Sequence, residues 1–113
     1  VQSVLVNWSI LTWALQQKFL DFVFDKLIRR GINSQSIDLG FNILGRLETK
    51  PKYEQEEYSA YFDDILSRAE SEPDSEIKFH LVKGLRSLEP PKLNTQNRRF
   101  WQRVKQLPAP QEP

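Results

Sequence analysis

The sequence predicts an all-α domain, an antiparallel bundle of about five helices that pair as hairpins. Apolar residues recur three or four positions apart over most of the chain, which is the spacing of one helix face. Gly and Pro residues fall between the periodic stretches and mark short turns. Residues 37–43 alternate as a strand does, but a lone strand would leave its backbone groups unpaired. We therefore expect a helix there and keep the strand as the alternative.

The longest periodic run, residues 8–30, is also the most apolar part of the chain. Its charged side chains form one narrow stripe, three or four residues apart: Lys18, Asp21, Asp25 and Arg29. Nearly all other positions are apolar, and so wide an apolar arc predicts a central helix that is buried from more than one side. Gly31 follows directly and is expected to end this helix in the left-handed conformation.

Four further helices are predicted over residues 36–48, 51–70, 76–88 and 95–107, so that residues 1–107 form one helical domain. Pro51 suits the first position of a helix. The caps of the last two helices are expected from short polar side chains: Asp74 or Ser75, and Asn94 or Thr95. The tail 108–113 has three prolines in six residues and is predicted to be disordered.

Two glycines stand inside the second predicted helix. Gly40 and Gly45 each weaken a helix by up to about 1 kcal/mol relative to Ala. We interpret them as positions where another helix approaches closely, since only Gly leaves room for a backbone at short range.

An eight-residue pattern recurs at an offset of 38, from Phe24–Gly31 to Phe62–Ala69. Each copy is followed by a polar turn and a second amphipathic helix, at an offset of about 40. With these features, residues 58–88 and, in part, residues 19–47 resemble HEAT-type helical repeats. The resemblance implies stacked helix pairs. The alternative is an ordinary five-helix bundle whose amphipathic helices look alike, and both interpretations give the same fold class.

The composition excludes several classes of protein. The chain has no Cys, so disulfide frameworks and thiolate chemistry are excluded. Together with the absence of a signal peptide, this favours an intracellular location, cytoplasmic or nuclear. The uncharged stretch 1–17 is rich in polar residues and too short to span a membrane. The chain begins at Val1 rather than Met, and we expect it to belong to a larger protein or an oligomer.

The sequence offers no catalytic constellation. His80 is the one histidine, and with Glu76 it supplies two ligands, which do not make a metal site. The four glycines are scattered, so no phosphate-binding loop is present, and no Gly-x-Ser-x-Gly turn occurs. We therefore predict no catalytic, cofactor-binding or metal-binding residues and do not expect an enzyme.

Charge is distributed unevenly although the net charge is only +1. Residues 51–90 carry five basic and ten acidic side chains, whereas residues 91–113 carry five basic and one acidic. The basic end places its charges around an indole: Arg98, Arg99, Arg103 and Lys105 near Trp101. Such a helix can neutralise phosphates and stack on bases. Alternatively, it docks on the acidic middle of the chain or contacts a protein partner.

Aromatic residues supply the remaining candidates. Tyr53 and Tyr58 lie in the acidic segment, and Tyr is favoured at protein interfaces. Four aromatic residues of the first helix mark an interface with a partner or a second copy if they are exposed: Trp8, Trp13, Phe19 and Phe22. The sequence thus predicts a non-catalytic protein–protein interaction or assembly module. A nucleic-acid-binding accessory domain is the alternative.

Overall fold

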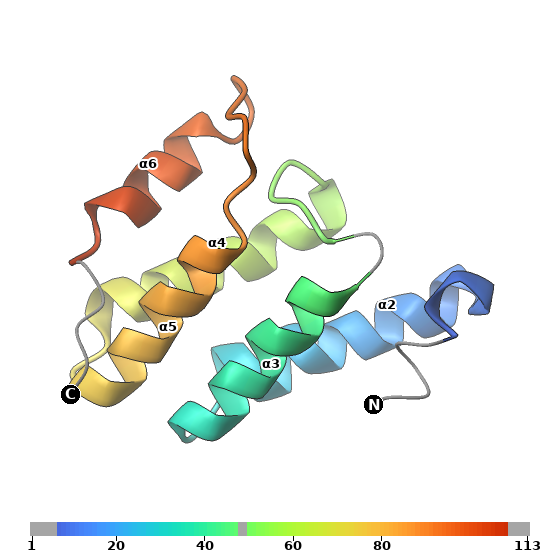
Figure 1. Cartoon of the computed structure of the whole chain (residues 1–113), viewed down its shortest axis with the longest axis horizontal. Coiled ribbons are helices and arrows are strands. Elements are labelled where there is room, and N and C mark those ends of the chain that lie inside the picture. Colours follow the sequence, from blue (N-terminus) through green and yellow to red (C-terminus); the bar gives the residue numbers. More distant parts are fainter. Residues whose placement is uncertain (1–6, 48–49, 109–113) are drawn as a thin grey trace.

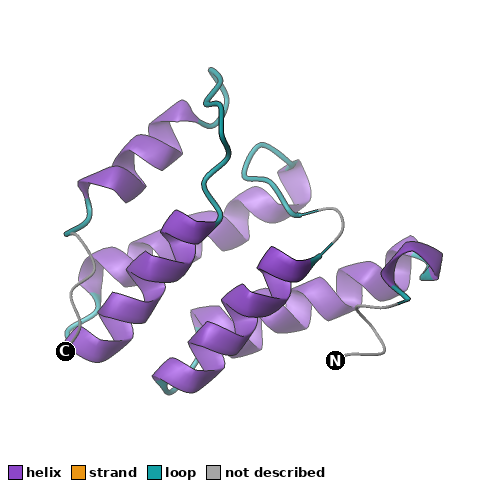
Figure 2. Cartoon of the chain, viewed as in Figure 1, coloured by secondary structure: helices purple, strands orange, loops and turns teal. Residues whose placement is uncertain are grey.

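The structure, a computed structural model, describes residues 7–47 and 50–108, and it confirms the all-α prediction (Figure 1). The elements are η1 (Trp8–Ile10), α2 (Trp13–Phe22), η2 (Val23–Arg29), α3 (Ser34–Arg46), α4 (Glu56–Ser71), α5 (Ser75–Ser87) and α6 (Arg98–Gln106). No strand occurs within the described residues, and residues 37–43 lie inside α3 (Figure 2). Three parts of the predictions lie outside the described residues: the first six residues of the predicted domain, the helix end at Glu48, and the tail beyond Pro108.

The helices form two hairpins that lie side by side. The continuous rod of α2 and η2 turns back into α3, and α4 turns back into α5 (Figure 1). Across the two hairpins, η2 packs on α4 and α3 packs on α5. The last helix, α6, packs on α5 and places the Phe100 ring against the Phe62 ring of α4. This arrangement gives two layers of helices with a shared core.

The second half of the rod is a π-helix, in which the Arg30 amide donates to the carbonyl of Asp25, five residues back, at 2.9 Å. Such wide turns are rare. The wider turn coincides with the most buried part of the rod, since Val23, Phe24 and Ile28 are fully enclosed. The central-helix prediction holds for η2, whereas α2 extends past the core and buries only Leu20.

Two glycines set the spacing between helices. A Cβ on Gly40 would lie 2.5 Å from Cγ1 of Ile28, so α3 can approach η2 only without a side chain there. A Cβ on Gly84 would overlap the ring of Phe41, which sets the approach of α5 to α3. Gly45 has open space around its Cβ position, and the close contact predicted at this residue is absent.

Three phenylalanines form an aromatic column through the core. The Phe24 and Phe62 rings meet edge to face with centroids 5.5 Å apart, and the Phe62 and Phe100 rings do so at 5.8 Å. The three residues come from η2, α4 and α6, and each is 38 positions after the one before. The column therefore joins the two hairpins and α6, and edge-to-face pairs of this kind add to the free energy of burial.

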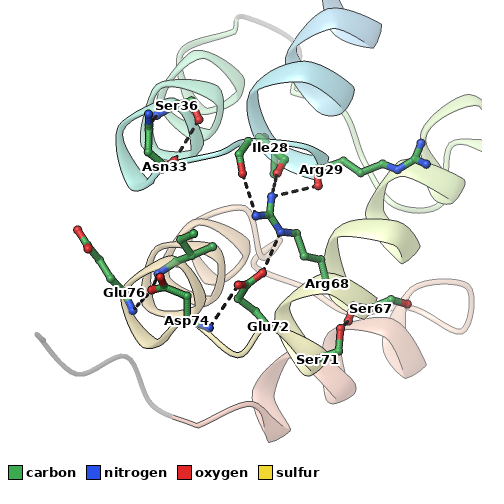
Figure 3. A network of polar contacts seen from close by, with 12 residues as sticks. Ile28, Arg29, Asn33, Ser36, Ser67, Arg68, Ser71, Glu72, Asp74 and Glu76 are labelled. Carbon is green, nitrogen blue, oxygen red and sulfur yellow. Dashed lines mark hydrogen bonds and ion pairs between the residues drawn. The ribbon is translucent and has the colours of Figure 1, made fainter.

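Arg68 of α4 fastens the end of η2 to the second hairpin (Figure 3). Its guanidinium group donates to the carbonyls of Ile28 at 2.8 Å, Arg29 at 3.0 Å and Gly31 at 2.8 Å. Carbonyls at a helix end have no partners within the helix, and one arginine satisfies three of them. Glu72, which accepts from Arg68 at 3.2 Å, holds the guanidinium in place.

Several predicted helix ends need correction. Gly31 has no left-handed conformation, since no described glycine has a positive φ. Pro51 does not open α4, which begins five residues later at Glu56, and α6 begins at Arg98 rather than Thr95. Asp74 caps α5 as predicted, because its carboxylate accepts from the amides of Glu76 and Ile77.

Candidate interaction surface

The aromatic residues of α6 are buried rather than available to a partner. Trp101 is 2% exposed and Phe100 is 3% exposed. The two rings contact each other and Phe62, so both neighbouring positions face the core. Trp101 therefore cannot serve as a contact residue at the surface, and no aromatic ring of α6 is free to stack on a base.

Half of the basic cluster is engaged within the fold. Arg103 pairs with Glu70 at 2.6 Å, and Lys105 pairs with Glu89 at 3.1 Å. Arg98 and Arg99 are exposed and form no ion pair with the described residues. The helix thus docks through its apolar face and partly through its charges, which leaves two adjacent arginines for other contacts.

The tyrosines of the acidic segment belong to the core and its edge. Tyr58 is 3% exposed, and its ring lies against Phe24, so it offers no contact surface. Tyr53 stacks on Phe100 with centroids 4.2 Å apart, and its hydroxyl donates to Asp63 at 3.1 Å. Burial, and then the hydrogen bond to Asp63, raises the pKa of Tyr53. Both hydroxyls stay protonated at neutral pH, and neither residue is placed as a free contact.

The two tryptophans near the amino end differ in exposure. Trp8 is buried against Phe19, and its carbonyl accepts from the Gln16 side chain at 2.7 Å. Trp13, by contrast, is 54% exposed. It lines a hollow of about 60 Å³ with Leu20 and Tyr58, at the edge where α2 extends past the core. Of the two, only Trp13 has the exposure expected of an interface residue.

Two further exposed apolar side chains lie on another side of α2 from Trp13. Leu15 is 51% exposed and Phe22 is 49% exposed, and Phe19, between them, is partly buried. These residues are four and three positions apart, so their side chains lie along one face. Lys18 and Lys26 fall beside them and are exposed. We call these five residues the α2 stripe: Leu15, Lys18, Phe19, Phe22 and Lys26.

The sequence names Phe19 and Phe22 as interface residues if they are exposed, but it does not predict the α2 stripe as a whole, because it assigns the apolar residues of this run to the core. The signal was present in the length of the run. The predicted helix 8–30 is interrupted at Leu11 and Thr12, but the rod of α2 and η2, Trp13–Arg29, is still longer than the hairpin partner α3, Ser34–Arg46, so part of it has no helix to cover it. Trp13 is an interface candidate because the first helix is unusually aromatic, and it is half exposed.

The carboxylates of the first hairpin are all engaged. Asp21 accepts from the Tyr61 hydroxyl of α4 at 2.6 Å, and this bond raises the pKa of Tyr61 to about 12. Asp25 accepts from Arg30 at 2.5 Å and pairs with Arg29 at 3.5 Å, and the bond from Arg30 lowers the pKa of Asp25. The third, Asp38, pairs with His80 of α5 at 2.7 Å.

Neither a metal site nor a membrane-spanning helix is found in the described part of the chain. No group of three or more His, Asp or Glu side chains that could hold a metal ion is found in residues 7–47 and 50–108. Among the helices described, none is long and apolar enough to cross a bilayer.

No protein-family model matches the chain, and comparisons with curated proteins and with solved structures gave no significant match.

Proposed function

We propose that this domain is a non-catalytic protein–protein interaction or assembly module that binds through the α2 stripe. The observation that carries the proposal is the exposure of Leu15 and Phe22 on one face of a helix. Single exposed apolar residues are ordinary, but a row of them on one face is typical of a docking site. Each side chain is already half buried, so a partner that covers the rest would gain about half of the usual 1.5–3 kcal/mol for burying Leu or Phe, or roughly 1 kcal/mol each.

The hairpin arrangement supports an assembly role. Internal repeats in the sequence, the paired packing of η2 on α4 and α3 on α5, and the aromatic column with its spacing of 38 residues fit a HEAT-like stack. In such a stack each hairpin buries its faces against its neighbours. On this proposal, the side of the first hairpin without a neighbour is where a partner would bind.

Nucleic-acid binding by α6 has less to support it. Stacking on bases requires exposed rings, and Phe100 and Trp101 are buried. Phosphate binding would rest on Arg98 and Arg99, since Arg103 and Lys105 already pair with carboxylates. Two arginines make a small electrostatic footprint, because affinity for nucleic acids scales with the number of phosphates neutralised.

The proposal is tested by capture from an extract of the source cells with three immobilised forms of the chain. The forms are the wild type, the double variant Leu15→Gln with Phe22→Gln, and the control Leu39→Gln. Leu39 is 46% exposed on α3, outside the α2 stripe, and Gln preserves helix propensity in each case. Quantitative mass spectrometry compares the proteins retained, after nuclease treatment and at two salt concentrations.

The expected result is one or more proteins, or further copies of this chain, that the wild type and the Leu39→Gln control retain and the double variant loses. Retention through apolar contacts should change little between about 50 and 200 mM salt, whereas phosphate-dominated binding falls steeply. Equal retention by all three forms would contradict the proposal. Retention that nuclease abolishes would instead favour the nucleic-acid function.

A further inference from the structure

From the charges around the α2 stripe, we propose that its partner is an acidic amphipathic helix, and this inference rests on the proposed function. The stripe combines an apolar row with two exposed lysines, and the rod that carries it has more basic side chains than carboxylates. A helix that carries apolar residues at the same spacing, flanked by Glu or Asp, matches it in both respects.

The two lysines are placed as flanking charges. Lys18 lies three residues after Leu15 and four before Phe22, and Lys26 lies four after Phe22. All of these positions share one side of the rod, since residues three or four apart are neighbours on a helix surface. Lys18 and Lys26 are exposed, and neither forms an ion pair with another described residue. Their ammonium groups are therefore free to meet carboxylates of a partner.

The carboxylates near the stripe are already used. Asp21 is held by Tyr61, Asp25 by Arg29 and Arg30, and none of these bonds involves a lysine of the stripe. Asp21 keeps its negative charge, since its partner is a neutral hydroxyl, whereas Asp25 is offset by two arginines. Residues 13–30 carry four basic side chains, Lys18, Lys26, Arg29 and Arg30, against these two carboxylates. The excess of positive charge along the rod favours acidic partners and disfavours basic ones.

The shape of the stripe favours a helix as the partner. From Leu15 to Phe22 the α-helical part of the rod rises roughly 10 Å at 1.5 Å per residue, which matches about two turns of a second helix, and Lys26 lies one further turn along. Apolar side chains four and three residues apart are the spacing that two helices use when they pack side by side. An extended peptide would need an unpaired strand edge, and the described residues contain no strand.

An anionic membrane is the main alternative partner for the α2 stripe, because interfacial helices also combine lysines with apolar residues. The apolar row here is narrow, with Phe19 partly buried against Trp8. An interfacial helix presents a broad apolar face to the lipid, whereas the opposite side of this rod is fixed to α3 and α4 through its core residues. The narrow stripe fits a single helix better than a lipid surface.

The test measures binding of two labelled probe peptides by fluorescence anisotropy. Each peptide has about 18 residues, enough for three turns with capped ends, and Leu at alternating spacings of three and four. One peptide carries Glu beside the Leu row and the other carries Lys. Phosphatidylserine-containing vesicles serve as the membrane probe. The chain is used as wild type, as Lys18→Glu with Lys26→Glu, and as the control Lys92→Glu in the exposed loop before α6.

The expected result is that the wild type and Lys92→Glu bind the Glu peptide at least about tenfold more tightly than the Lys peptide, and that Lys18→Glu with Lys26→Glu reverses the preference. Equal binding of both peptides, no binding of the Glu peptide, or vesicle binding without a peptide preference would overturn the inference. If capture from extract still depended on Leu15 and Phe22, the proposed function would stand while the acidic helix would be rejected. If neither depended on the stripe, both would fail.

Discussion

Single atoms decide how closely the helices of this domain approach each other. Gly84 leaves space for the ring of Phe41, and Gly40 leaves space for Ile28, so that α3 packs closely on both of its neighbours. A glycine inside a helix costs up to about 1 kcal/mol relative to Ala, and close packing offsets that cost at these two positions. Gly45 has no such neighbour.

The pair Gly84→Ala and Gly45→Ala tests this assignment. Ala at 84 would press on the Phe41 ring and should lower the free energy of unfolding by about 1–3 kcal/mol. Ala at 45 meets open space and should raise it by up to about 1 kcal/mol. Urea denaturation followed by circular dichroism measures both changes. A Gly84→Ala protein as stable as the wild type would show that α3 and α5 are further apart than described.

The hydrogen bond of Tyr61 should be visible in the pH dependence of the free energy of unfolding. The bond to Asp21 raises the pKa of Tyr61 to about 12, whereas an unfolded tyrosine ionises near about 10. Between these values the unfolded chain loses the proton and the folded chain keeps it, so stability should fall as pH rises from about 10 to 12. Tyr61→Phe should remove that part of the fall, as measured by denaturation at each pH. An unchanged profile in the variant would argue against the bond.

At the scale of helices, Arg68 links the end of η2 to α4 through three carbonyls (Figure 3). Arg68→Leu keeps much of the side-chain volume but leaves these carbonyls without a charged donor. We expect a loss of roughly 2–3 kcal/mol in the free energy of unfolding. As a matched control, Arg103→Leu removes an exposed pair with Glu70 and should cost under about 1 kcal/mol. Similar losses in the free energy of unfolding for the two variants would contradict the claim that Arg68 stabilises the packing of η2 on α4.

Local rules predicted most helices but not all of their ends. Asp74 caps α5 as expected because a cap depends only on residues two or three positions away. Pro51 does not start α4, because the Gln55 side chain accepts from the Lys52 amide at 2.8 Å and Tyr53 stacks on Phe100 of a distant helix. The second of these contacts is tertiary, and no sequence spacing encodes it.

The candidate surface was harder to predict than the fold, for the same reason. Composition alone cannot separate Phe22, which is half exposed, from Phe24, which is fully buried, because both are aromatic residues on one helix. Trp101 is the reverse case, since basic neighbours suggested a surface position, yet packing against Phe62 buries it. Which apolar residue faces solvent depends on where the neighbouring helices end, and that is a property of the assembled fold.

At the scale of the molecule, two hairpins and a final helix stack around one aromatic column, and the first hairpin leaves part of its long rod uncovered (Figure 1). On the proposed function, the exposed apolar residues of the α2 stripe serve binding rather than folding. Replacing a buried apolar residue lowers the free energy of unfolding substantially, whereas replacing an exposed one changes it little.

The most direct measurement is the free energy of unfolding of Leu15→Gln with Phe22→Gln, beside Leu20→Ala on the buried side of the same helix. We expect the double variant to stay within about 1 kcal/mol of the wild type, because both side chains are half exposed. Leu20→Ala, at 2% exposure, should lose about 2–5 kcal/mol. A double variant that loses as much as Leu20→Ala would show that the α2 stripe is part of the core and would contradict the claim.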